Sequence, residues 1–276
     1  MPNVELLRRL ETYLDAVPRS AAGVEPIGGL TLFTKVGPGW PYYARPALAG
    51  PAVTRTDLDA ARRRQRALAL PEAFEWVHET TPSMRPVAEA AGLLVESLPL
   101  MVLSRPMAVP VPVGAVVRML TPDDPVLPLA TAVADVAFSA GTTTTGPAGT
   151  TAIAGPAERD ATAAIMPAER VSAARERMRR GRTFSAVAEE AGVGPLCVGS
   201  HQPVGEVSEI VGVGTLPTAR RRGLAAAVTA RLVADAAGRD VSVVFLSAGS
   251  EDVARLYARV GFVRVGTSCI AAPPGG

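Results

Sequence analysis

The strongest signal in this chain is the stretch Val-Gly-Val-Gly-Thr-Leu-Pro-Thr-Ala-Arg-Arg-Arg-Gly-Leu-Ala, which spans residues 211–225. An apolar strand runs into Pro217, and Gly223 then opens an alanine-rich helix. The first turn of a helix leaves backbone N–H groups unpaired, and the helix dipole adds partial positive charge there. Glycine lets a bulky anion approach the backbone because it has no Cβ. The pattern predicts a phosphate-binding turn, although no P-loop lysine follows the glycine.

Two motifs in register resemble the GNAT superfamily of acyl-CoA N-acyltransferases. Residues 220–225 are similar to the family's pyrophosphate signature, Gln/Arg-x-x-Gly-x-Gly/Ala, and residues 254–262 resemble its late helix and Tyr-x-x-x-Gly-Phe ending. A helix over 223–237 and a strand over 241–246 are expected between them, in the family's order. The resemblance covers about residues 116–272. It implies an α/β protein whose catalytic domain, 116–276, has the GNAT fold, a mixed and mostly antiparallel sheet flanked by helices.

The first half carries a weaker copy of the same pattern. When Gly92 is aligned with Gly261, the apolar strand 74–77 falls on 243–246 without a gap, and a helix and a terminal strand coincide as well. Recurrence at constant spacing suggests an internal duplication. The first copy lacks the chemistry, because Ala88 stands where the second copy has Tyr257. We therefore expect residues 1–112 to form a degenerate GNAT-like domain that acts as a scaffold.

Composition narrows the class of protein. The chain has 276 residues, 48% of them hydrophobic, and a net charge of +2, which favours neither nucleic acid nor a membrane surface as a partner. No apolar run is long enough to span a membrane, and Met1–Asp15 lacks an apolar signal core, so we expect a cytoplasmic protein. Cys197 and Cys269 are expected to be reduced and buried. His78 and His201 are too isolated to predict a metal site, and we expect His201 in a surface turn.

The candidate general base is a glutamate. Glu209 lies in the expected strand 207–213 and, by alternation, shares a face with Val207, Val211 and Val213. A carboxylate on an apolar face is either paired or has a raised pKa, and a raised pKa suits a base. Enzymes of the family often use a glutamate at this point, directly or through water. Glu206, on the opposite face, is the competitor, and a salt bridge to an arginine is the structural alternative for Glu209.

Other roles follow from the resemblance. Tyr257 stands where the family places the tyrosine that protonates the CoA thiolate, although a packed core tyrosine would look the same. Ser250 stands where the family often has a cofactor-binding asparagine, and it could instead cap the helix. The resemblance implies that acetyl-CoA is held by backbone groups of the strand end and of the turn. These residues are Val213, Gly214, Thr215, Arg220, Arg221, Arg222, Gly223, Leu224 and Ala225.

We therefore expect an N-acetyltransferase that moves an acetyl group from acetyl-CoA to a primary amine of a small molecule by direct attack in a ternary complex. No Ser–His–Asp or Cys–His arrangement is recognisable, and a serine of 247–250 has no nucleophile elbow around it. The alternative is an acyl-CoA-binding sensor or scaffold without catalysis. The sequence leaves open the acceptor, the acyl chain and the choice between monomer and homodimer. Asp123, Asp124 and Asp135 would favour a polycationic acceptor only if they reach the site, which the loop 139–156 is expected to shape.

Overall fold

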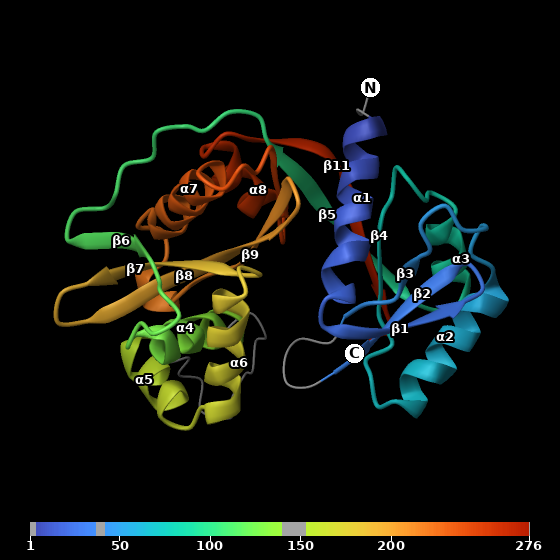
Figure 1. The fold of residues 1–276 in the computed structure, drawn as a ribbon, viewed down its shortest axis with the longest axis horizontal. Coiled ribbons are helices and arrows are strands. Elements are labelled where there is room, and N and C mark those ends of the chain that lie inside the picture. The colour runs from blue at the N-terminus through green and yellow to red at the C-terminus, as the bar shows by residue number, and fades with distance from the viewer. Residues whose placement is uncertain (1–3, 37–41, 140–152, 276) are drawn as a thin grey trace. The chain divides into compact units, whose positions relative to one another are not determined.

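The computed structural model describes residues 4–36, 42–139 and 153–275, which form two compact units (Figure 1). Unit 1 contains Met1–Val102, Ser247–Ala254 and Val263–Gly276, and unit 2 contains Leu103–Leu246 and Arg255–Phe262. Unit 1 thus takes two segments from the C-terminal end of the chain. The boundary near residues 112–116 stays a prediction, and the loop expected over 139–156 lies largely outside the described residues.

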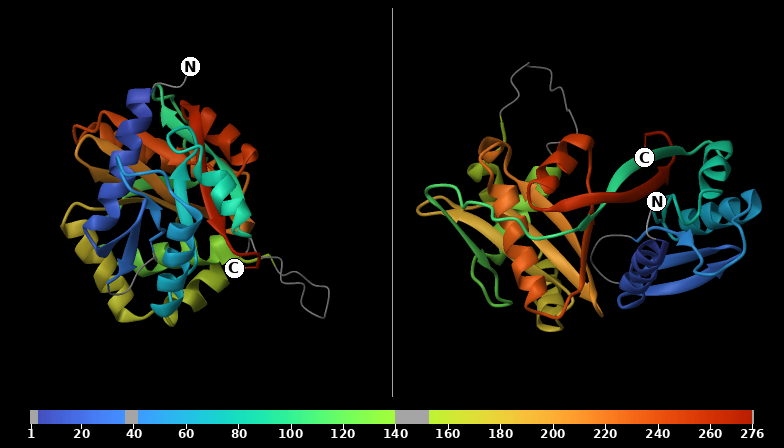
Figure 2. Two further views of the ribbon diagram at one scale, coloured as in Figure 1. Left: turned by 90° about the vertical axis from the view of Figure 1, so that its right-hand side faces the viewer. Right: turned by 90° about the horizontal axis from the view of Figure 1, so that it is seen from above.

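Unit 1 has a small three-stranded sheet, a second set of strands and three helices of its own. Its core gathers Trp76, Phe74, Met84 and Leu58, all without solvent exposure. α2 packs against α3, as the left view of Figure 2 shows. The antiparallel pairs are β1–β2, β2–β3 and β4–β11. The elements are α1 (Val4–Arg19), β1 (Ala22–Ile27), β2 (Leu30–Lys35), β3 (Arg45–Pro46), α2 (Arg55–Ala67), β4 (Phe74–Val77), α3 (Met84–Ala90), β5 (Leu94–Leu103) and β11 (Phe262–Ala272).

The expected repeat of strand, helix, glycine and strand is present in both copies. β4, α3 and β5 follow one another in the first half, as β10, α8 and β11 do in the second. Gly92 and Gly261, which separate helix from terminal strand, both have positive φ, 75° and 110°. Such backbone favours glycine. The two glycines therefore adopt a similar backbone conformation between helix and strand, which supports the alignment of the copies.

Unit 2 is a sheet with helices on both faces (Figure 1). Its strands are ordered β10-β9-β8-β7-β6, with β10 parallel to β9 and the other pairs antiparallel. The mixed, mostly antiparallel sheet expected from the resemblance is confirmed. The elements are β6 (Ala115–Met119), α4 (Leu127–Ser139), α5 (Pro156–Ala164), α6 (Ala168–Arg179), β7 (Phe184–Glu190), β8 (Gly194–Val204), β9 (Val207–Thr215), a 3-10 turn (Pro217–Ala219), α7 (Leu224–Ala237), β10 (Val243–Ser247) and α8 (Glu251–Ala258).

Two glycines set the helices close to this sheet. A Cβ on Gly199 would lie 3.1 Å from side-chain atoms of Val213 and Val228, so α7 packs tightly over one face of β8. A Cβ on Gly214 would lie 2.9 Å from the Cβ of Ala137, so α4 packs tightly over the opposite face of β9. Close packing of this kind needs small residues because interiors are dense. The two faces of the sheet are thereby defined by α7 on one side and α4 on the other.

The segment 158–181, which is rich in alanine, arginine and glutamate, forms two helices and not one. α5 ends at Ala164 and α6 begins at Ala168, with Pro167 at the start of the second helix. Proline has no backbone N–H and disfavours helical geometry in the residue before it, so it separates the helices. After this break α6 contacts α4.

Candidate active site

The turn before α7 exposes a row of backbone donors. Arg221 and Gly223 both have positive φ, 63° and 86°, and the helix begins at Leu224. In the part of the chain that the structure describes, no hydrogen bond is accepted from the backbone N–H groups of residues 221–226. A Cβ on Gly223 would have a single neighbour within 4 Å, a Pro112 carbon at 3.7 Å. Unpaired donors with open space beside them at a helix start suit an anion.

The three arginines of this turn differ in what they contact. Arg220 donates to the backbone carbonyls of Ala137, at 3.0 Å, and Thr215, at 3.4 Å. It therefore fastens the turn to the neighbouring elements. Arg222 is paired with Glu190, which offsets its charge. Arg221 is exposed, and none of the described residues pairs with its side chain. Of the three, Arg221 is the one whose guanidinium has no partner among the described residues and is left for a ligand.

β9 carries a bulge that changes which residues share a face. Val198 and Ser200, two residues apart on β8, pair with Gly214 and Val211, three residues apart on β9. The extra residue lies at Gly212, whose φ is 62°. A bulge of this kind shifts the alternation of side chains by one. The expectation that Glu209 shares a face with Val213 is therefore wrong, because Val213 lies on the α7 face.

Glu209 lies on the face that α4 covers. Glu209 pairs with Gln202 of β8, and two residues further on Val211 pairs with Ser200, so these four side chains lie on one face. The Glu209 side chain is half-buried. Glu206, its competitor, lies outside the strand in the turn between β8 and β9 and is exposed. Its carboxylate accepts a hydrogen bond from the Ser242 hydroxyl at 3.3 Å. The expectation that Glu206 lies on the opposite face of the strand is therefore wrong, because Glu206 lies in the hairpin turn before β9.

β9 and β10 pair only over a short length. Their ladder runs from Val207–Val243 to Glu209–Phe245 in the described residues, whereas β9 continues to pair with β8 as far as Thr215. From Ile210 onward, one edge of β9 is therefore not used by β10. Backbone donors and acceptors on such an edge are available to a ligand. Val213, Gly214 and Thr215, which are expected to bind acetyl-CoA through backbone groups, lie on this part of β9.

Tyr257 is a buried tyrosine whose hydroxyl reaches solvent. Its side chain is 8% exposed and meets Phe262 edge to face at 6.0 Å. The hydroxyl forms no hydrogen bond with a described residue. It is not fully buried, so it keeps some contact with solvent. Burial raises its pKa, and the nearby Cys197 thiol adds to this. Burial also raises the pKa of Cys197 to about 12, so both groups are protonated at neutral pH.

Two other predicted cofactor residues have contacts within the protein. The Ser250 hydroxyl accepts a hydrogen bond from the backbone N–H of Val253 at 3.2 Å, at the start of α8. It therefore caps this helix, as an N-terminal serine commonly does. The Thr215 hydroxyl donates to the Cys197 sulfur at 3.2 Å, on the α7 face. The side chains of both residues are engaged, which leaves their backbone groups for any cofactor contact.

His201 corrects two sequence-based expectations. It lies within β8, fully buried, and not in a surface turn. Its Nδ1 is 2.9 Å from the Ser208 hydroxyl and its Nε2 is 3.0 Å from Oδ2 of Asp235, so a Ser–His–Asp chain does exist. Ser208 is itself fully buried. A nucleophile must reach its substrate, so this chain of hydrogen bonds is part of the core under α7 and not a hydrolytic triad.

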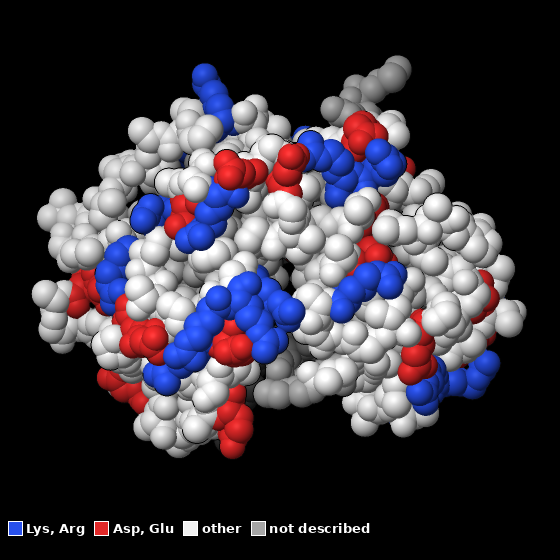
Figure 3. All heavy atoms as spheres, viewed as in Figure 1, with Lys and Arg blue, Asp and Glu red and all other residues white. Residues whose placement is uncertain are grey.

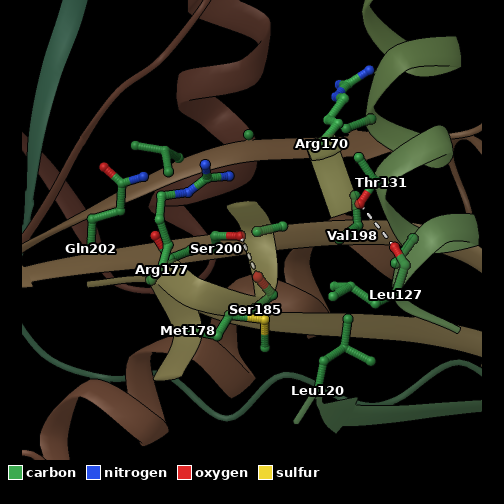
Figure 4. Close-up of a pocket in the computed structure, with 16 residues that line it drawn as sticks. Leu120, Leu127, Thr131, Arg170, Arg177, Met178, Ser185, Val198, Ser200 and Gln202 are labelled. Carbon is green, nitrogen blue, oxygen red and sulfur yellow. Dashed lines mark hydrogen bonds between the residues drawn. The ribbon is translucent and has the colours of Figure 1, made fainter. Parts of the chain in front are cut away.

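A pocket opens on the other face, between α4, α6 and the strands (Figure 4). It has a volume of about 210 Å³ and reaches the bulge at Gly212. Hydroxyl groups of Ser185 and Ser200 meet at 2.8 Å on its floor. Arg170 and Arg177 of α6 also line it. Sequence reasoning missed this pocket, because its walls come from five separate elements and no motif joins them.

The three aspartates that could have attracted a polycationic acceptor are neutralised. Asp123 pairs with Arg179, Asp124 with Arg118, and Asp135 with Arg170. None of them lines the pocket. The structure thus gives no acidic cluster at this site among the described residues, and none of their His, Cys, Asp and Glu side chains gather as a metal would require. No helix in the described ranges is long and apolar enough to cross a membrane.

Comparison with known proteins agrees with this geometry. Residues 158–262 match the model of the acetyltransferase (GNAT) family. A GCN5-related N-acetyltransferase from Kribbella flavida is 19% identical with a TM-score of 0.70, over 98% of this chain and 96% of that one. A tandem GNAT protein from the clavulanic acid biosynthesis pathway is 15% identical with a TM-score of 0.56, over 99% and 96%. No curated protein was found to match this sequence.

Residues 158–262 are thus an acetyltransferase domain of the GNAT family, and the expected family is confirmed. The structural likenesses show the fold, and that fold extends over nearly the whole chain, so the N-terminal half is GNAT-like in structure as well. The family transfers acyl groups from acyl-CoA. The turn before α7, Tyr257 and the pocket all lie within unit 2.

Proposed function

We propose that this chain transfers an acetyl group from acetyl-CoA to the primary amine of a small molecule, in a ternary complex and without a covalent enzyme intermediate. The observation that carries the proposal is the run of unpaired backbone N–H groups at residues 221–226, with open space at Gly223. These donors fit a pyrophosphate, which needs several hydrogen bonds at once. Arg221 adds a positive charge that no described carboxylate offsets, and the edge of β9 that β10 does not pair with lies beyond Glu209 for the pantetheine arm.

The reaction moves one acyl group and releases one proton. The amine nitrogen attacks the thioester carbonyl carbon, so a C–N bond forms, the C–S bond breaks and the sulfur leaves as a thiolate. An amine that starts as an ammonium gives up two protons, one of which ends on the sulfur. The chain must therefore accept a proton on the side of the amine and supply a hydrogen bond or a proton on the side of the sulfur.

Glu209 and Tyr257 are our candidates for these two tasks. Glu209 lies on the α4 face beside the pocket, where an amine would enter. Tyr257 lies near Cys197, whose partner Thr215 is on the α7 face. With these two residues, the amine would attack from one side of the β9 edge and the thiolate would leave on the other, which suits direct transfer of the acyl group. Because its pKa is raised, the Tyr257 hydroxyl keeps its proton at neutral pH, and it stabilises the departing thiolate chiefly by donating a hydrogen bond.

Calorimetric titration with acetyl-CoA tests the binding half of the proposal. Gly223→Glu places a negative charge where the pyrophosphate should bind and should abolish binding. Gly223→Asn is the control, since asparagine tolerates the positive φ of 86° and adds no charge. One site per chain that only Gly223→Glu removes supports the proposal. Two sites would mean that the N-terminal copy also binds, and absence of binding would contradict the proposal.

Turnover tests the catalytic half. With a panel of primary amines and release of free CoA as the readout, Tyr257→Phe and Glu209→Gln should each lower kcat by about 10²-fold, the usual range for a lost acid or base. Binding of acetyl-CoA should change little in either variant. Acetyl transfer that neither change slows would refute the residue assignments. Tight binding without acetylation of any amine would favour the sensor function in its place.

A further inference from the structure

The pocket beside Glu209 has one apolar side and one polar, cationic side. Leu120, Leu127, Met178 and Val198 supply apolar surface. Ser185, Ser200, Thr131, Thr183 and Gln202 supply hydroxyl and amide groups, and α6 supplies two guanidinium groups. None of the lining residues is acidic. A site with this composition favours a ligand that joins an apolar body to an anionic group.

The two arginines are not equivalent. Arg170 forms a bidentate pair with Asp135, at 2.6 and 2.7 Å, so its charge is offset. Arg177, two turns further along α6, pairs with no carboxylate of the described residues. Figure 4 shows the Arg177 and Gln202 side chains extending toward the same end of the pocket, whereas the Arg170 guanidinium points away from it. The uncompensated charge of the pocket is therefore that of Arg177.

The wall also contains an unused donor. The Thr183 hydroxyl is buried and has no hydrogen-bond partner, and Thr183 lines the pocket. A buried polar atom without a partner is unfavourable, and an acceptor on a ligand can recover that loss. Figure 3 shows basic side chains gathered over the α6 part of unit 2, with acidic ones among them. An anionic acceptor would thus meet favourable charge on approach and at the site.

We propose that the acceptor is an amine that also carries a carboxylate and an apolar side chain, as an apolar α-amino acid does. This inference rests on the proposed acyl transfer and names its substrate class. The carboxylate binds Arg177, the apolar side chain lies against Leu127 and Met178, and the amine faces Glu209. Gln202 faces Glu209 across the ladder and extends toward the same end of the pocket as Arg177, so a carboxylate and an amine on one carbon can reach both. The amine loses its proton on the Glu209 side and forms the new amide bond.

Binding separates this inference from catalysis. The probes are L-methionine and L-leucine with their amides, titrated with and without saturating CoA, because each amide keeps the amine and the side chain but loses the anion. The protein should bind each acid at least tenfold more tightly than its amide. Arg177→Gln should weaken binding of the acids about tenfold and leave the amides unchanged, because only the acids lose a charge-assisted hydrogen bond.

The matched control is Arg179→Gln. Arg179 lies on the same helix, pairs with Asp123 and does not line the pocket, so this change should alter neither acid nor amide binding. Equal affinity for acid and amide, no effect of Arg177→Gln, or no binding of any probe would overturn the inference. Transfer assays with the same probes distinguish the two proposals. Selective binding of the acids without acetylation would support the carboxylate site and refute the acyl transfer. Equal acetylation of acids and amides would support the acyl transfer and refute the carboxylate site.

Discussion

The imidazole Nε2 of His201 lies 3.0 Å from Oδ2 of Asp235, in the core between β8 and α7. Asp235 also accepts from Arg239, whose guanidinium lies 3.4 Å over the ring of Phe184. Phe184 in turn stacks on His201, with ring centroids 5.2 Å apart. The neutral tautomer with its proton on Nε2 satisfies both imidazole nitrogens, since Nδ1 then accepts from Ser208. This network closes on itself and holds α7 to the sheet.

His201→Phe should destabilise the protein by about 2–4 kcal/mol, because the ring shape is kept while Asp235 and Ser208 lose a buried partner. Urea unfolding at pH 7.5 measures the change. Ser208→Ala is the milder companion, which removes one hydroxyl and should cost about 1 kcal/mol. A His201→Phe protein within about 0.5 kcal/mol of the original would show that the network contributes little.

The same histidine predicts a pH dependence of stability. Burial lowers the pKa of His201 below its ordinary 6.5, and this outweighs the opposite effect of Asp235. Well above pH 6.5 neither the folded nor the unfolded protein binds the proton on His201. As the pH falls below 6.5, the unfolded chain takes it up and the folded chain does not, so the free energy of unfolding falls by up to about 1.4 kcal/mol per pH unit.

Urea unfolding between pH 5 and pH 8 checks this dependence. The loss of stability below pH 6.5 should be present in the original protein and absent from His201→Phe. Carboxyl groups with lowered pKa values, such as those of Asp124 and Asp235, act only at lower pH, below 3.8. Equal slopes in the two proteins between pH 5 and pH 6.5 would assign the dependence to another group.

Gly261 is closely surrounded in the second copy. A Cβ there would lie 1.8 Å from the carbonyl oxygen of Arg105, and the φ of 110° is unfavourable for any side chain. Gly261→Ala should therefore cost at least about 3 kcal/mol in urea unfolding. Gly92→Ala is the matched control, since Gly92 has a φ of 75° and nothing within 4 Å. That change should cost only about 1 kcal/mol, and equal losses in both would mean that backbone strain alone matters.

The arginines of the α7 turn should separate affinity from stability. Arg221→Gln should weaken acetyl-CoA binding up to about fivefold, and less at high salt, with stability unchanged. Arg220→Gln should lower stability by about 1–2 kcal/mol, because its two bonds to backbone carbonyls are lost. Arg231→Gln, an exposed arginine further along α7, is the control for Arg221. If Arg231→Gln weakens binding equally, the effect reflects net charge and not the turn.

Local signals in the sequence predicted local structure well. Gly223 and the apolar spacing behind it indicated a helix that does begin at Leu224, and the Tyr-x-x-x-Gly-Phe pattern indicated a helix, a glycine with positive φ and a strand. Each of these depends on residues within one or two turns of one another. The mixed sheet followed from the resemblance those motifs carry.

Errors arose where distant pairing decides the outcome. Gly212 looks like any strand glycine until its pairing with β8 reveals the bulge, and the bulge moves Val213 to the other face. Gly199 and Pro203 suggested a turn around His201, but the turn lies at Gly205 and Glu206, and β8 runs through to Val204. The pocket and the Ser208–His201–Asp235 chain join residues from different elements. Periodicity along one strand could not have located either of them.

β4 is paired with the last strand of the chain. Val77 faces Ser268 and Phe74 faces Ala271, although unit 2 is encoded almost entirely between them. A ribosome makes β4 early, and its antiparallel partner appears only once residues 263–272 have been made. By then every strand from β6 to β10 has already been synthesised. The acetyltransferase domain can therefore mature first, while the segment that precedes it waits with Trp76 uncovered, an inversion of the usual N-terminal-first order of folding.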